Sequence, residues 1–157
     1  MPIMIKNFNT LVANARSRKD RAARKLALMC LEAALQAADP RKIMKSVLKM
    51  KNSRLQVKER FYDLSGYRRI FVLGGGKATG SMAVFLEHLL GKRITDGYVN
   101  VLRGTRTRYA TERIKLNEAS HPIPDEPGRR GVGRMLKMLQ GVTDEDLVIY
   151  LLSGGAS

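Results

Sequence analysis

The first third of the chain follows a helical pattern of apolar positions. Between residues 22 and 38, Leu28, Leu31 and Leu35 recur at intervals of three or four residues, and further alanines and leucines widen the stripe. This spacing predicts a helix whose broad apolar face packs firmly against a larger body. Cys30 lies within the pattern and is expected to be a small buried residue.

A second helix is predicted directly after Asp39. Asp39 and Pro40 combine an N-cap residue with a proline that suits the first helical turn. Apolar residues at helical spacing then form one face: Ile43, Met44, Val47 and Leu48. Residues 1–52 are therefore expected to be a helical lead-in, and residues 55–64 a short extended segment or hairpin.

The remaining chain alternates between apolar strands and amphipathic helices. The expected strands are residues 70–73, 97–102, 113–117 and 147–152, and the expected helices are residues 78–89 and 128–139. The first and last strands are continuous apolar runs, which is typical of strands covered on both faces. His88 lies off its helix's apolar stripe and is expected at the surface. The alternation predicts an α/β fold with a doubly wound, mostly parallel, Rossmann-like sheet.

Composition narrows the class of protein. The chain has 157 residues, is 44% hydrophobic and carries a net charge of +15, so it is expected to fold. No apolar run approaches the ~20 residues that span a bilayer, and the basic start lacks the apolar core of a secretory signal. The single cysteine cannot build a disulfide framework. We therefore expect a cytoplasmic protein with no membrane partner.

Most of the positive charge lies in the first half of the chain. Residues 1–69 carry a net charge of +12 and residues 70–157 a net charge of +3. A basic flank attracts nucleic acid, anionic membranes or anionic metabolites, although a solvated basic helix has the same composition. Since no basic segment contains interleaved aromatic residues or Cys/His fingers, nucleic-acid binding is not favoured.

Two of the expected strands end in glycine-rich turns, Gly74-Gly75-Gly76 and Ser153-Gly154-Gly155. Parallel strands present their carboxyl ends at one edge of the sheet, where ligands bind. Glycines let the backbone approach such a ligand closely, and free amide hydrogens bind anions. Lys77 follows the first turn and could contact a phosphate or carboxylate; alternatively, it is a solvent-exposed residue of a tight turn.

Neither common nucleotide motif fits the first glycine turn. A P-loop requires a glycine and a hydroxyl residue where this chain has Phe71 and Ala78. In the dinucleotide fingerprint the third glycine falls at Thr79, and the next strand ends near Arg103 without the acid that binds a ribose. An NADP-dependent enzyme could use Arg103 in place of that acid, but the mismatches disfavour this interpretation.

A proline-containing connector adds titratable groups near the same edge. Residues 117–126 read Asn-Glu-Ala-Ser-His-Pro-Ile-Pro-Asp-Glu, and the prolines favour an extended backbone. Its candidates for proton transfer or for a position near a metal are Glu118, His121, Asp125 and Glu126. Alternatively, the segment is a rigid connector in which Asp125 and Glu126 cap the following helix.

Together these segments resemble the glycerate 2-kinase family, whose longer members carry an N-terminal nucleotide-fold domain and a C-terminal MOFRL domain. The resemblance rests on Gly76-Lys77-Ala78, on Glu-Ala-x-His-Pro-x-Pro-Asp from Glu118 to Asp125, and on the closing Ser-Gly-Gly-Ala-Ser, in this order. It implies ATP-dependent phosphorylation of D-glycerate at its 2-hydroxyl, with ATP and a divalent metal such as Mg²⁺.

The resemblance also implies roles for individual residues. It maps the family's catalytic lysine onto Lys77, with Gly74, Gly75 and Gly76 beside it for substrate or phosphate binding. The family's serine-glycine loop maps onto Ser153, Gly154, Gly155 and Ser157. Metal ligands are not assigned by this comparison, and a homo-oligomer is compatible with it.

The family continues beyond the motif in which this chain stops. Residues 1–157 are therefore expected to be an incomplete N-terminal domain, with residues 53–157 as its α/β part, and to have little activity alone. Two other functions stay open. A sugar-phosphate isomerase-type domain would bind a phosphosugar without consuming ATP, and a basic nucleic-acid-binding module would depend only on the charge of residues 1–69.

Overall fold

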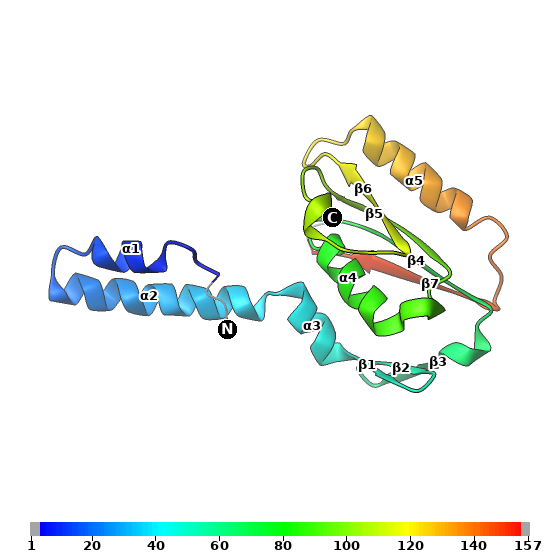
Figure 1. Cartoon of the computed structure of the whole chain (residues 1–157), viewed down its shortest axis with the longest axis horizontal. Helices are drawn as coiled ribbons and strands as arrows, with labels where there is room; N and C mark the ends of the chain where they lie inside the picture. The colour runs from blue at the N-terminus through cyan, green and yellow to red at the C-terminus, as the bar shows by residue number, and fades with distance from the viewer. Residues whose placement is uncertain (1–3, 155–157) are drawn as a thin grey trace. The chain divides into compact units, whose positions relative to one another are not determined.

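The structure is a computed structural model that describes residues 4–154. Contacts divide the chain into two compact units, Met1–Ile43 and Met44–Ser157 (Figure 1). The first unit is helical, and the second contains both β-sheets of the described chain. Because residues 48–51 form a strand, the helical part ends earlier than the expected lead-in of residues 1–52.

The first unit contains helices α1 (Phe8–Ala13) and α2 (Arg18–Ala37). The carboxylate of Glu32 on α2 accepts hydrogen bonds from the backbone N–H groups of Met4 and Ile5 at 2.8 and 3.0 Å. These bonds hold the segment before α1 against α2, so the two helices form a hairpin.

The expected burial of α2 is wrong for the described residues. Leu26 is 64% exposed and Leu31 is 56% exposed, and Cys30 is also exposed rather than buried. The physical reason is the small size of α1, which has only six residues and leaves most of the apolar surface of the longer helix uncovered.

The second unit begins in helix α3 (Pro40–Val47), whose Met44 is buried. A three-stranded antiparallel sheet follows, with β1 (Leu48–Lys51), β2 (Arg54–Val57) and β3 (Arg60–Asp63) in the order β1-β2-β3. The helix after Asp39 and the hairpin are thus confirmed. Leu48 belongs to the strand rather than to the helix.

The main sheet of the second unit is parallel and has the strand order β6-β5-β4-β7. Its strands are β4 (Arg69–Gly75), β5 (Asp96–Leu102), β6 (Ile114–Ala119) and β7 (Asp146–Leu152). Helix α4 (Thr79–Leu90) connects β4 to β5, and helix α5 (Glu126–Met138) connects β6 to β7. This is the order of the first four strands of the dinucleotide-binding fold, so the predicted doubly wound sheet is confirmed.

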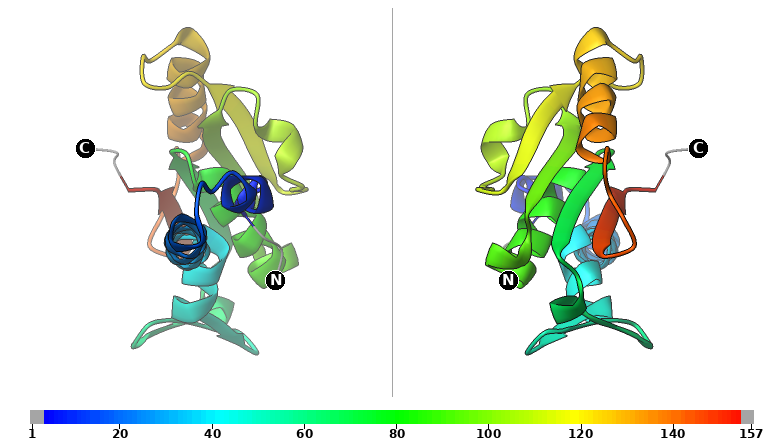
Figure 2. Two further views of the ribbon diagram at one scale, coloured as in Figure 1. Left: turned by 90° about the vertical axis from the view of Figure 1, so that its left-hand side faces the viewer. Right: turned by 90° about the vertical axis from the view of Figure 1, so that its right-hand side faces the viewer.

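Helices α4 and α5 lie on opposite faces of the sheet (Figure 2). Val72 and Val99 pack with Leu86 of α4 in the main core, and all three are nearly inaccessible to solvent. On the other face, the side chains of Asn100 and Asn117 donate hydrogen bonds to backbone carbonyls at the start of α5. His88 of α4 is exposed, as predicted.

Strand β7 was expected to be buried on both faces, and one face is instead exposed. It lies at the edge of the sheet, and Val148, Tyr150 and Leu152 are between 36% and 58% exposed. The register places Val148 beside Phe71 and Tyr150 beside Leu73. Helix α5 packs mainly on β5 and β6 on this face. A continuous apolar run therefore did not distinguish an edge strand from a central one.

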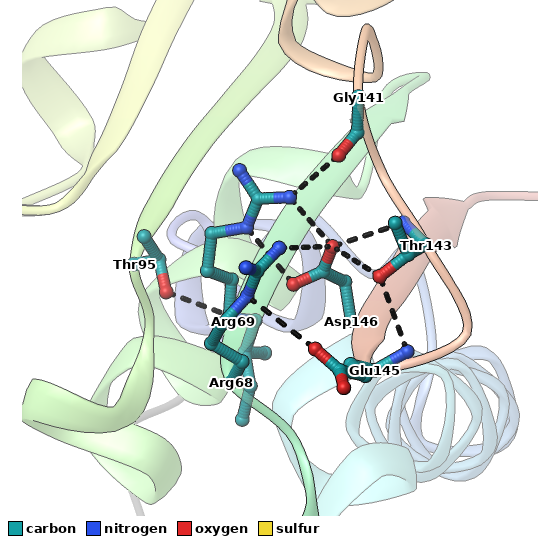
Figure 3. Close-up of polar contacts among 8 residues, drawn as sticks. Arg68, Arg69, Thr95, Gly141, Thr143, Glu145 and Asp146 are labelled. Carbon is teal, nitrogen blue, oxygen red and sulfur yellow. Dashed lines mark hydrogen bonds and ion pairs between the residues drawn. The ribbon is translucent and has the colours of Figure 1, made fainter.

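An ion pair joins the first residues of β4 and β7 (Figure 3). Arg69 donates to both carboxylate oxygens of Asp146, with N–O distances of 2.9 and 2.6 Å, and also to the carbonyl of Gly141. The backbone N–H of Thr143 donates to the same carboxylate at 3.0 Å. The side chain of Asp146 is fully buried. The hydrogen bonds from Arg69 and then Thr143 lower the pKa of Asp146 well below its usual 3.8.

We expect Asp146→Asn to lower the melting temperature at neutral pH by at least about 5 °C, because the substitution leaves Arg69 without its buried partner. A lowered carboxyl pKa adds stability above the unfolded-state pKa and loses it as the pH falls through the folded-state value. The difference between the two proteins should therefore shrink below about pH 4 in calorimetric scans. Asp144→Asn, on the same loop but exposed, is the control. Equal melting temperatures for the two variants would contradict this role.

Candidate functional site

The site lies where the chain reverses its direction of winding through the sheet. From β4 the chain proceeds through β5 to β6 on one side, and it then crosses back to β7 on the other side of β4. The carboxyl ends of β4 and β7 are therefore adjacent, while the connections that leave them diverge. In open α/β sheets, ligands bind in the crevice at this switch point.

Two glycines allow the carboxyl ends of β4 and β7 to lie close together. Gly74 is paired with Leu151, and a Cβ atom at Gly74 would overlap the carbonyl oxygen of Leu151. Gly76 has a φ of +128°, and a Cβ atom there would overlap the hydroxyl of Ser153. The glycine turn is shorter than expected, because Gly74 and Gly75 are still residues of β4.

A cavity of about 680 Å³ opens at this edge. Its lining includes most of the residues that the sequence singled out: Gly74, Gly75, Gly76, Lys77, His121, Asp125, Ser153 and Gly154. The two glycine-rich turns therefore face one shared hollow. Gly155 and Ser157 lie outside the described residues.

Lys77 is the cation of the first turn. Its side chain is exposed along the cavity, and it makes no hydrogen bond or ion pair with any residue between 4 and 154. The ammonium group is therefore available to an anion in the cavity. Helix α4 begins two residues later, at Thr79, so its positive N-terminal end lies next to the same turn.

The proline-containing connector brings His121 and Asp125 to the cavity. Asp125 is the N-cap of α5, since its carboxylate accepts the N–H of Gly128 at 2.9 Å, and it also pairs with Arg103. The bond from Gly128 contributes most, with further bonds from Ser120 and Arg103, and together they lower the pKa of Asp125 to about 2. Asp125 therefore remains ionised and is a weak proton acceptor.

Glu118 and Glu126 do not line the cavity. Glu118 accepts a hydrogen bond from the N–H of Arg106 at 3.0 Å, and this bond is the largest of several that lower its pKa. Glu126 forms a two-bond pair with Arg129 on the exposed surface of α5. The spacing in the sequence could not show that other partners hold these two carboxylates and that neither lines the cavity.

Sequence reasoning missed the amide pair beneath α5. Asn117 donates to the side-chain oxygen of Asn100 at 2.8 Å and to the carbonyl of Pro127 at 3.0 Å, and Asn100 donates to the carbonyl of Gly128. A Cβ atom at Gly131 would overlap Asn100. This close packing positions the first turn of α5 at the cavity. The only signal in the sequence was a polar residue within each of two strands.

The described residues do not gather a metal site. Between residues 4 and 154, no three His, Cys, Asp or Glu side chains are placed to hold one ion. Asp125 is the only carboxylate on the described lining of the cavity, and it is already bonded to α5 and Arg103. We therefore assign no protein ligand to a metal among these residues.

Comparison with known proteins identifies the family. Residues 26–157 match the family described as "Domain of unknown function (DUF4147)". The chain belongs to this family. The DUF4147 match covers both glycine-rich turns and the proline-containing connector, so all three motifs lie within the family domain.

Relatives of this DUF4147 chain include two named glycerate 2-kinases, which confirms the resemblance. The enzyme of Pyrococcus horikoshii is 32% identical over 136 residues, and the D-glycerate 2-kinase of Thermotoga maritima is 28% identical over 134 residues. Each match covers 85% of this chain but only 29% and 28% of those proteins. The chain thus spans less than a third of their length. A protein of Agrobacterium vitis, provisionally named a hydroxypyruvate reductase, is 36% identical over 91 residues, which are 57% of this chain and 20% of that protein.

Two solved structures share the fold. A Pyrococcus horikoshii protein aligns with a TM-score of 0.71 and 31% identity over 85% of this chain and 29% of its own. A Thermotoga maritima structure named glycerate kinase aligns with a TM-score of 0.65 and 26% identity over 86% of this chain and 29% of its own. Among the described residues, no helix is both long and apolar enough to span a membrane.

The contact between Gly76 and Ser153 can be tested by substitution. Gly76→Ala should lower the melting temperature clearly more than Gly104→Ala, because both glycines have positive φ but only Gly76 faces another residue. Adding Ser153→Gly should recover part of the loss in the Gly76→Ala protein, measured as a double-mutant cycle. Equal effects of the two alanine substitutions, with no coupling to Ser153, would contradict the close approach of the two turns.

Proposed function

We propose that this chain provides the anion-binding half of a kinase that phosphorylates D-glycerate at its 2-hydroxyl, with ATP as the phosphoryl donor. The observation that carries the proposal is the shared cavity, which brings Lys77 and the Ser153 turn together at the switch point of the sheet. The names of the relatives support the same reaction. The complete activity is proposed for a protein of the relatives' length that contains this chain.

Phosphoryl transfer mainly requires positioning and neutralisation of phosphate charge. Lys77 is suited to that role, because its ammonium group has no partner among residues 4–154. It would hold either the carboxylate of glycerate or the phosphoryl group in transfer. The turns at Gly76 and Ser153 are suited to bind phosphate oxygens through backbone N–H groups, since they lie close together with the hydroxyl of Ser153 facing Gly76.

His121 is our preferred candidate for orienting the hydroxyl of glycerate and accepting its proton. It is exposed on the cavity, and its side chain makes no hydrogen bond with any residue between 4 and 154. Asp125 is less suited, because its low pKa makes it a weak base and Arg103 and α5 already hold it. Glu118 and Glu126 remain predictions without a position on the cavity.

The requirement for Mg²⁺ also remains a proposal. Mg²⁺ usually keeps several waters and binds substrate phosphates with only one or two protein carboxylates, so a cluster of three is not needed. The described residues offer Asp125 alone, in an arrangement that is already satisfied. We therefore assign no step of the proposed reaction to the metal. A cytoplasmic location and a homo-oligomer likewise remain expectations.

The proposal can be tested in a chimera in which residues 26–157 replace the matching segment of the Pyrococcus horikoshii enzyme. We expect ADP release that depends on glycerate. Lys77→Ala should lower kcat/KM at least about 100-fold, because it removes the charge that would hold the carboxylate of glycerate or the phosphoryl group. Lys92→Ala, exposed and away from the cavity, is the control.

Two results would contradict the proposed kinase activity. One is a chimera with an intact circular-dichroism spectrum and no glycerate-dependent ADP release. The other is turnover that Lys77→Ala leaves unchanged. Reduction of hydroxypyruvate by NADH or NADPH, measured in the same preparation, would instead favour the activity for which the Agrobacterium vitis relative is named. No observation on the cavity favours a sugar-phosphate isomerase.

A further inference from the structure

The antiparallel sheet β1-β2-β3 has one apolar face and one basic face. Side chains alternate along each strand, so one set packs against the core of the second unit: Leu48, Met50, Leu55, Val57 and Tyr62. The opposite set lies on the other face of the sheet, where most of its side chains are exposed. The outward set does not take part in the cavity at the carboxyl ends of β4 and β7.

Strand register arranges the outward side chains in two rows. Lys49, Gln56 and Phe61 lie side by side across the three strands, and Lys51, Arg54 and Asp63 form the next row. A shallow hollow of about 400 Å³ is lined by residues of both rows. Phe61 contributes to this hollow and is 63% exposed. An aromatic ring is thus presented to solvent among cations.

The positive charge of this face is only partly neutralised. Lys49 and Lys51 are exposed and make no ion pair within residues 4–154. The acid in the two rows is Asp63, which lies opposite Arg54. Its carboxylate accepts hydrogen bonds from the hydroxyl and the N–H of Ser65 at 2.6 and 3.0 Å, and those bonds, the hydroxyl's first, lower its pKa. Asp63 therefore offsets Arg54 and leaves both lysines unpaired.

We propose that this face binds single-stranded nucleic acid. Lysine and arginine side chains bind the phosphate backbone, and an exposed aromatic ring stacks with an unpaired base. A duplex does not offer its base faces to Phe61, so the combination favours a single strand. This inference is independent of the proposed kinase. Sequence reasoning disfavoured nucleic-acid binding because no basic segment contains interleaved aromatic residues. Strand register, which the sequence does not show, places Phe61 in one row with Lys49.

Fluorescence anisotropy of a labelled single strand of about ten nucleotides, titrated with the whole chain, tests the proposal. We expect saturable binding that weakens as salt rises. Each phosphate contact contributes about 0.7 to the slope of log K against log salt for single strands, so Lys49→Ala/Lys51→Ala should reduce the slope by about 1.4.

The matched control is Arg21→Ala/Lys25→Ala, which removes the same charge from exposed positions on α2. It should leave the slope nearly unchanged. If both double variants reduce the slope equally, binding follows the net charge of the chain, and the face is not a site. Circular dichroism of each variant verifies that it is folded.

Substitutions of Phe61 distinguish the contribution of base stacking to binding from the contribution of charge. Phe61→Leu should raise the Kd for the single strand about tenfold, whereas Phe61→Tyr should leave it within about twofold, because only the first change removes the ring. A 2-aminopurine base in the oligonucleotide should be quenched by the unsubstituted protein and not by Phe61→Leu. Duplex of the same sequence should bind equally well to both proteins. Equal single-strand affinity of Phe61→Leu and the unsubstituted protein, or no binding at all, would overturn the proposal.

Discussion

The spacing between the carboxyl ends of β4 and β7 depends on two positions that have no side chain. At Gly74 a Cβ atom would overlap the backbone of β7, and at Gly76 it would overlap Ser153. Parallel pairing brings the two strands to the same edge. Only glycine avoids the backbone of β7 at Gly74, and the φ of +128° favours glycine at Gly76. The cavity, the exposed ammonium group of Lys77 and the adjacent start of α4 all depend on that approach.

The order of the elements was largely predictable from the sequence, because it depends on local periodicity and on the handedness of crossovers. Burial was less predictable. The apolar run at Leu147–Leu152 forms an edge strand that is partly exposed, since α5 packs mainly on β5 and β6, and the helix that contains Cys30 is exposed, since α1 is short. An apolar composition indicates that a helix or strand has a face suited to packing. It does not indicate whether the described residues cover that face.

The candidate site was likewise predictable only in part from the sequence. Lys77, His121, Asp125 and Ser153 reach one cavity because each follows the carboxyl end of a strand, a position that the sequence reveals. Other features depend on side-chain direction and strand register: the absence of Glu118 and Glu126 from the cavity lining, the amide pair beneath α5, and the row from Lys49 to Phe61. These are tertiary properties, and motif spacing along a single chain does not carry them.

The proposed function requires the two glycine-rich turns to bind one anion together. Titration of the ¹⁵N-labelled chain with 2-phosphoglycerate, followed by backbone amide chemical shifts, tests this most directly. We expect the amides of Gly76, Lys77, Ser153 and Gly154 to shift together with a single Kd. Shifts confined to one turn, or absent from both while other regions respond, would contradict it.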